Sequence, residues 1–259
     1  MADNQAGNGS QDQGEADVIS GQLGSPAVRA TGRPGASGGR EPIFNQMPIG
    51  VAIVVALILF GHVAAMSVGP AMYDALLAVY ALTPSLLSQD TSSGDWLSAF
   101  KMLIGHQFLH GGTIHLVMNL AMLLQAGPIA EAGLRGHRDA ATRFVFFFVL
   151  CGIGGGLTFA LFNPGSWTQT IGASGAISGV FSGFLWAAIG LARPGQAMLK
   201  PVLASAVIFV FINVGLAALA RTLDFVPIAW ESHLGGFITG LILYPIFVRM
   251  GRKHTSSAD

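Results

Sequence analysis

Four polar residues that stand in apolar stretches of this sequence have the side chains needed for acyl transfer. Ser174 lies within Gly172–Gly175, and His233 begins the sequence His-Leu-Gly-Gly. A serine hydroxyl becomes an effective nucleophile when a neighbouring base takes its proton, and imidazole suits that role near neutral pH. Attack on a peptide carbonyl develops negative charge on its oxygen, which His115, Asn119 and the Ser174 backbone N–H are suited to stabilise.

Each of these residues also has a purely structural interpretation. A serine beside glycines allows close helix packing, and His or Asn side chains form hydrogen bonds between membrane helices. The occurrence of Ser174 together with His233 favours chemistry for that pair. For His115 and Asn119 the structural and the chemical roles are compatible.

Four other residues of chemical interest are expected to be structural. His106 and His110 precede an apolar stretch and are expected to tie down a loop. Glu131 is expected to form a hydrogen bond to neighbouring loops. The single cysteine, Cys151, excludes a disulfide within the chain and is expected to be a small buried hydrophobe. No carboxylate or cysteine joins the histidines at ligand spacing, so neither a metal nor another cofactor is expected.

The elements that carry these residues are expected to be membrane helices. Of the 259 residues, 52% are hydrophobic and 10% are charged, and the mean hydropathy is +0.59. An average soluble domain has about 25% charged residues. The net charge is zero, which gives no indication of a nucleic-acid partner.

Six apolar stretches are long enough to cross a bilayer. They cover residues 48–68, 113–130, 142–162, 171–191, 201–220 and 228–248. The connection between the first two contains the apolar stretch 76–87, which is too short to span, and we predict partly inserted, irregular structure there. The sequence therefore predicts an all-α membrane protein, a bundle of six transmembrane helices.

The two ends of the chain differ from this bundle. Residues 1–45 are rich in Gly, Gln, Ser and Asp with almost no apolar clustering, so they are predicted to be a disordered tail. A signal peptide is not expected, because the first apolar run begins late and the early residues are acidic. The predicted organisation is a tail over 1–45, a six-helix domain over 46–250 and a short C-terminal tail over 251–259.

Positive charges distinguish the two sides of the predicted bundle. Six spans place both termini on one side, and of the 13 Lys and Arg residues only Lys101 and Arg221 lie on the other. The positive-inside rule then places both termini in the cytoplasm, and we expect a multi-pass protein of a bacterial inner membrane. The second, fourth and sixth spans run inward, so His115, Ser174 and His233 lie roughly 5–10 Å below the outer surface.

Glycines give the converging helices smooth faces. They recur every fourth residue after Ser174 and again after His233: Gly175, Gly179 and Gly183, then Gly236 and Gly240. Such faces allow helix backbones to approach closely. We expect this approach to bring Ser174 and His233 within hydrogen-bond distance.

With these motifs the sequence resembles the rhomboid family of intramembrane serine proteases. The matching motifs, in order within residues 48–250, are Phe108-Leu109-His110-Gly111, His115-xxx-Asn119, Gly127-Pro128-xx-Glu131, Gly172-Ala173-Ser174-Gly175 and His233-Leu234-Gly235-Gly236-xxx-Gly240. Each motif alone is modest, but their order on the expected spans makes the resemblance specific.

The resemblance implies that Ser174 and His233 form a catalytic dyad. It implies that His115 and Asn119 donate to the oxyanion. It also implies a partly embedded hairpin between the first two spans, and substrates that are single-span membrane proteins entering from the lipid bilayer and cut near the outer face. Supporting roles are expected for four residues: His110, Gly172, Gly175 and Gly236.

Three positions depart from the family pattern. Ser178 stands where the family often has Tyr or Phe packed against the histidine, which leaves open what orients the His233 ring. Ser232 replaces a small apolar residue before His233. Glu231 is two residues from His233, so the two side chains do not share a helix face and Glu231 is not expected to complete a catalytic triad. The arginine expected after Trp96 has no clear counterpart.

Two other functions fit parts of this sequence. A non-cleaving relative that binds and routes membrane clients would explain the departures at Ser178 and Ser232, but both Ser174 and His233 are present. A small transporter would explain polar groups at one depth, but mid-depth charges and repeated halves are not apparent. The sequence gives neither the substrate nor the oligomeric state.

Overall fold

The described part of the chain is helical throughout its secondary structure. The structure is a computed structural model that describes residues 47–134, 139–192, 195–222 and 228–255. The predictions for residues 1–45 and for the end of the C-terminal tail lie outside these residues. Within them, β geometry is limited to one isolated bridge between Leu82 and Thr170. Six helices are long and apolar enough to cross a bilayer, so the chain is an integral multi-pass membrane protein.

The six spanning helices match the six predicted stretches. They are α1 (Ile49–Ser67), α5 (Thr113–Gly133), α6 (Ala140–Phe162), α7 (Ser174–Ala192), α8 (Leu199–Thr222) and α9 (Trp230–Thr255). The prediction of an all-α bundle is thus confirmed, with ends that shift by a few residues. The fourth helix begins three residues later than predicted because Gly172 has a φ of 127°, which no helical residue adopts.

The connection between α1 and α5 is helical, so the prediction of irregular structure there was wrong. It forms α2 (Pro70–Tyr80), α3 (Pro84–Ser93), α4 (Trp96–Gly105) and a 3₁₀ turn, His106–Phe108. Pro70 and Pro84 stand in the first turn of their helices, where the fixed φ of proline fits. Gly94, with a φ of 82°, ends α3, and Asp95 caps α4 through the Ser98 N–H. These start and stop signals make three short helices of the segment.

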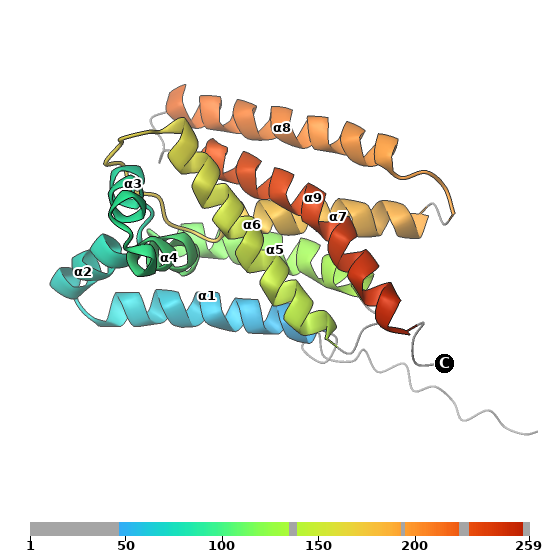
Figure 1. Cartoon of the computed structure of the whole chain (residues 1–259), viewed down its shortest axis with the longest axis horizontal. Helices are drawn as coiled ribbons and strands as arrows, with labels where there is room; N and C mark the ends of the chain where they lie inside the picture. The colour runs from blue at the N-terminus through green and yellow to red at the C-terminus, as the bar shows by residue number, and fades with distance from the viewer. Residues whose placement is uncertain (1–46, 135–138, 193–194, 223–227, 256–259) are drawn as a thin grey trace, which may run out of the picture. The chain divides into compact units, whose positions relative to one another are not determined.

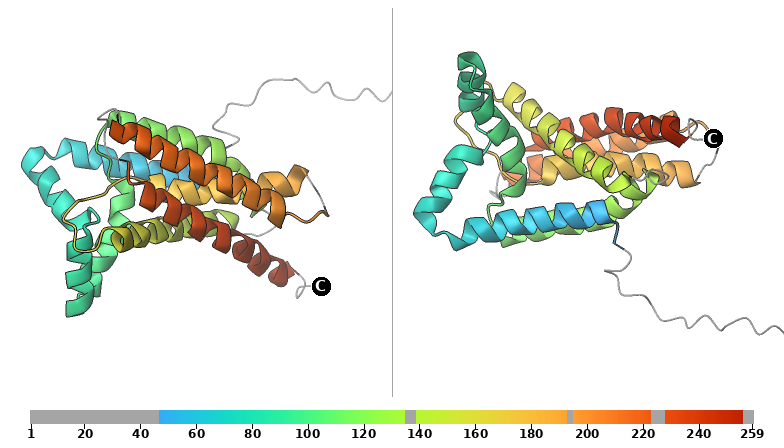
Figure 2. Two further views of the ribbon diagram at one scale, coloured as in Figure 1. Left: turned by 90° about the horizontal axis from the view of Figure 1, so that it is seen from above. Right: turned by 60° about the horizontal axis from the view of Figure 1, so that its bottom comes forward.

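Helices α2, α3 and α4 gather at one end of the spanning helices, as Figures 1 and 2 both show. At this same end α5, α7 and α9 begin. Helix α7 packs against α5, α6, α8 and α9. Of the apolar stretch that qualifies each helix as a membrane span, 56% is buried in α7 and 17% in α8. Among the six spanning helices, α8 is therefore the least buried by the rest of the bundle.

Helices α7 and α9 meet backbone to backbone. A Cβ atom on Gly236 would collide with the carbonyl oxygen of Gly175, and one on Gly240 would collide with the backbone of Gly179. Only glycine at these positions permits the observed spacing of the helices. The predicted smooth faces are therefore the faces in contact.

At the opposite end of the bundle, Glu131 holds the start of α1. Its buried carboxylate accepts hydrogen bonds from the N–H groups of Gly50, at 3.1 Å, and Val51, at 2.8 Å. These amides belong to the first turn of a helix and have no partner within it, and the positive end of the helix dipole favours the negative charge. Glu131 thus has the structural role expected of it, with a helix terminus as its partner.

Replacing Gly236 by alanine is expected to destabilise the fold, because the added methyl group forces α9 away from Gly175. Overpacking of this kind costs about 1–3 kcal/mol. The matched control is Gly215→Ala in α8, where a Cβ atom meets nothing within 4 Å. Thermal unfolding in detergent should show a lower midpoint for Gly236→Ala and an unchanged or higher one for Gly215→Ala. Equal midpoints for the two variants would contradict the packing described.

Candidate active site

Three side chains from three helices form one chain of hydrogen bonds. Ser174 is the first residue of α7, and its Oγ lies 2.8 Å from Nε2 of His233 in the first turns of α9. The other ring nitrogen, Nδ1, lies 2.9 Å from Oδ1 of Asn213 in α8. The structure therefore brings together the predicted pair and adds a third residue that the sequence analysis missed.

The amide of Asn213 determines the direction of this chain. Its Nδ2 donates to the carbonyl oxygen of Phe209 at 3.3 Å, which leaves Oδ1 to face the histidine. A carbonyl oxygen only accepts, so Nδ1 of His233 carries the proton. Nε2 is then the acceptor, and the Ser174 hydroxyl donates to it. This is the arrangement that a base needs before it removes the serine proton.

The backbone ahead of Ser174 is fixed by the connection between α1 and α5. Thr170 exchanges backbone hydrogen bonds with Leu82, at 3.0 and 3.1 Å. The N–H of Gly172 donates to the carbonyl oxygen of His106 at 2.8 Å. The N–H of Ala173 donates to Nε2 of His110 at 3.4 Å. His106 and His110 were expected to tie down a loop, and in the structure they hold the two residues that precede α7.

His115 and Asn119 lie on α5, close to the same segment. A Cβ atom on Gly172 would lie 2.6 Å from Cε1 of His115, so this ring covers the residue two positions before Ser174. Nδ2 of Asn119 donates to the carbonyl oxygen of His115 at 3.1 Å, which uses one of its two N–H groups. Within the described residues, no hydrogen bond links either side chain to Ser174.

The two departures beside the pair have different explanations. The Ser178 hydroxyl donates to the carbonyl oxygen of Ser174, one turn back, at 2.9 Å. Ser232 is buried between α6 and α7, where a Cβ atom on Gly175 would lie 2.6 Å from its Oγ. Space for only a small side chain accounts for serine at position 232. The side chain that contacts Nδ1 of His233, the ring nitrogen that does not face Ser174, is Asn213 of α8.

The sequence did contain a signal for Asn213. It is the amide in the middle of a stretch, residues 201–220, that otherwise reads as one of the most apolar spans. A polar group inside a span is expensive and by default indicates function. The signal was weak because Asn213 belongs to no motif with Ser174 or His233.

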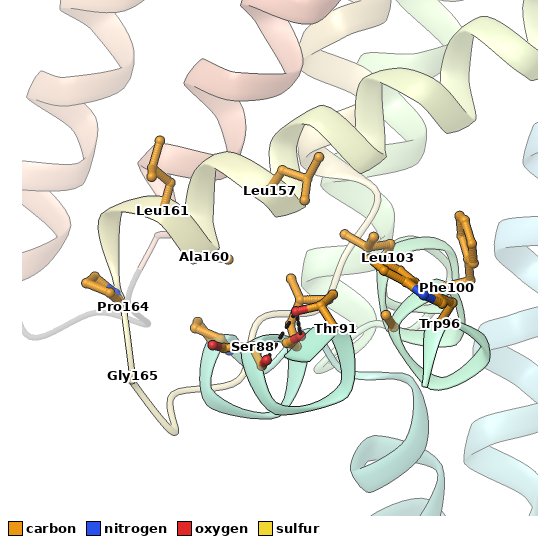
Figure 3. Close-up of a pocket in the computed structure, with 13 residues that line it drawn as sticks. Ser88, Thr91, Trp96, Phe100, Leu103, Leu157, Ala160, Leu161, Pro164 and Gly165 are labelled. Atoms are coloured by element: carbon orange, nitrogen blue, oxygen red, sulfur yellow. Dashed lines mark hydrogen bonds between the residues drawn. The ribbon is translucent and has the colours of Figure 1, made fainter. Parts of the chain in front are cut away.

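A pocket of about 460 Å³ lies apart from this site, between α3, α4 and the end of α6 (Figure 3). Its walls are mainly apolar and include Trp96, Phe100 and Leu157. The hydroxyl of Thr91 donates back to the carbonyl oxygen of Leu87 in its own helix, at 2.8 Å. No residue of the hydrogen-bonded chain lines this pocket, so the chemistry and the hollow are at separate places.

Comparison with known proteins gives consistent matches. Residues 97–250 match the family model described as the Rhomboid domain. The chain is 31% identical over 182 residues to RHOMBOID-like protein 4 of Arabidopsis thaliana, covering 67% of this chain and 41% of that relative. It is 27% identical over 142 residues to Rhomboid-like protease 3 of Toxoplasma gondii, covering 52% of this chain and 47% of that relative. The chain thus spans less than half the length of the curated relatives it matches.

Acid is expected to destabilise the fold through the two histidines that hold the start of α7. Burial lowers the pKa of His106 to about 4, and burial with the rings of His115 and His62 nearby lowers the pKa of His110 to about 4. In the unfolded chain the histidine pKa is about 6.5, so that state binds more protons and stability falls as the pH drops from about 6.5 towards 4.

The measurement is the thermal midpoint at about pH 7 and about pH 5. His110→Gln removes one of the two groups and should reduce the difference between the midpoints at the two pH values. An undiminished difference in His110→Gln would show that this histidine does not account for the acid sensitivity.

Proposed function

The chain belongs to the rhomboid family, and on that premise we propose that it is an intramembrane serine endopeptidase. Ser174 is the proposed nucleophile and His233 the proposed base. The observation that carries the proposal is the 2.8 Å separation of the Ser174 Oγ from the His233 Nε2. The name of one relative, Rhomboid-like protease 3, is consistent with the proposal.

The proposed reaction begins as the Ser174 oxygen bonds to the carbonyl carbon of the substrate. The hydroxyl proton passes to Nε2 of His233, and the imidazolium then delivers it to the leaving amine nitrogen as the peptide bond breaks. Water, activated by the same histidine, releases the acyl group from Ser174 in a second step. Protonation of His233 before the reaction would block it, because imidazolium cannot accept the serine proton.

Three donors are proposed for the oxygen that becomes negative. The N–H of Ser174 belongs to the first turn of α7, where backbone amides lack partners and the helix dipole favours negative charge. His115 lies against Gly172, beside the nucleophile. The second N–H of Asn119 completes the set. These positions support the proposal that the three groups donate hydrogen bonds to the developing oxyanion.

The proposed substrates are single-span membrane proteins, cut near the outer face of the membrane. The site lies where α5, α7 and α9 begin, at one end of the bundle (Figure 1). With both termini in the cytoplasm, as the distribution of Lys and Arg favours, this end faces outward. A bacterial inner membrane is the proposed location. The competing function, a non-cleaving protein that binds membrane clients, would use the same fold without the reaction.

Ser174→Ala is expected to abolish cleavage, because no other group can replace the attacking oxygen. The matched control is Ser178→Ala, one turn further along α7, which removes a hydroxyl that donates only to its own helix. Both variants, purified in detergent, should be incubated with a single-span substrate that has a destabilised helix near the outer face. Cleavage by Ser174→Ala at the parent rate would refute the proposal. A parent that binds this substrate without cutting it would favour the non-cleaving function.

The proposed orientation predicts which introduced cysteines a membrane-impermeant maleimide can reach. Cys151, the native cysteine, is fully buried and gives a low background. Ser92→Cys, at the exposed end of α3, should be labelled in intact cells. Gln196→Cys, before α8 at the opposite end of the bundle, should be labelled only after permeabilisation. The reverse labelling pattern would show that the protein has the opposite orientation in the membrane.

A further inference from the structure

Helix α8 presents a single polar residue in the middle of the stripe that faces the bundle. The buried and half-buried residues between positions 202 and 220 recur at helical spacing: Val202, Ser205, Ala206, Phe209, Val210, Asn213, Ala217 and Ala220. Apart from Ser205, near the start of the helix, every other member of this set is apolar. A polar side chain in a spanning helix is retained at a cost and needs a partner. The partner of Asn213 is Nδ1 of His233, 2.9 Å away.

An aromatic stack places Asn213 at the height of the histidine. Phe209 lies one turn before Asn213, and Phe237 lies one turn after His233. Their rings stack with centroids 4.1 Å apart and an angle of 12° between planes. The ring of Phe181 in α7 also stacks with the ring of Phe209, with centroids 5.4 Å apart. The same three helices are thus joined twice, by this stack and by the chain Ser174–His233–Asn213.

We propose that Asn213 is the positioning residue for His233, taking the place of an aromatic side chain at position 178. Its Oδ1 accepts a hydrogen bond from the Nδ1–H group, which holds the ring in one tautomer and directs Nε2 at Ser174. The bond also persists when the ring becomes imidazolium during the reaction. Asn213 touches neither the substrate nor the reacting atoms, so it acts through the histidine. The expected effect of Asn213 on the reaction rate rests on the proposed function, whereas its effect on the tautomer of His233 does not.

The first test compares Asn213→Leu with Asn163→Leu. Leucine is close to asparagine in size and cannot accept a hydrogen bond. Asn163 is a matched control, because its Nδ2 makes the same bond to the carbonyl four residues back, at 2.9 Å, and it lies at the C-terminal cap of α6, away from His233 in the sequence and in a different helix. General base catalysis contributes about 10²–10⁴-fold, so loss of the correct tautomer should lower kcat by about tenfold to a hundredfold. Asn163→Leu should stay within about twofold of the parent. A kcat for Asn213→Leu within the same range would overturn the inference.

The second test uses Asn213→Asp and the pH profile. A carboxylate beside Nδ1 favours the protonated ring, so the acid limb of kcat/KM should move to higher pH by about one unit or more. Among the described residues, His115 of α5 is the other titratable group that influences His233. It is present in every variant, so a shift confined to Asn213→Asp reports on position 213. An acid limb that coincides with that of the parent would contradict the positioning role.

A spectroscopic test separates this inference from the proposed function. In the ¹⁵N NMR spectrum of histidine-labelled protein in detergent, His233 should be in the Nδ1–H form in the parent and in Asn163→Leu. In Asn213→Leu this form should give way to a mixture of tautomers. An unchanged spectrum would overturn the inference whatever the activity. If the spectrum changes as expected and the parent still cuts no substrate, the positioning role stands and the proposed function fails.

Discussion

The contact of α7 with α9, backbone against backbone, sets the geometry on which the rest of the site depends. Ser174 and His233 both stand at the start of their helices, so the distance between them follows the distance between the helix axes. A Cβ atom on Gly236 would enlarge that distance by colliding with Gly175. The hydrogen bond of 2.8 Å is therefore a result of two helices meeting without side chains between them.

The second requirement is that Ser174 begins its helix at a fixed place. The backbone ahead of it is held by Leu82, by the carbonyl oxygen of His106 and by the ring of His110. All three belong to the connection between α1 and α5 and not to a spanning helix. This connection thus acts on the site through the backbone of one short segment. Burial keeps the His110 ring neutral, so its Nε2 can accept a hydrogen bond, whereas His106 acts through its backbone carbonyl oxygen.

The sequence predicted the spans and the central pair for a physical reason. Hydropathy over some twenty residues is a strong signal, and Ser174 and His233 stand at the same point of helices that run in the same direction. The connection was predicted less well, because its helices are short and their start and stop signals, such as Pro84 and Gly94, are local. Asn213 was missed because it belongs to no motif with Ser174 or His233, and a single polar residue in an apolar span does not by itself indicate its partner.

The glycine contact also constrains how this protein can change over generations. A glycine has no smaller residue to mutate to, so every substitution at Gly175 or Gly236 adds volume where the structure has none to give. Single mutations can weaken this contact but cannot improve it. The outer face of α8, by contrast, is exposed and can drift among apolar residues. Selection on such a bundle should therefore preserve two lines of glycines while the lipid-facing surface around them diverges.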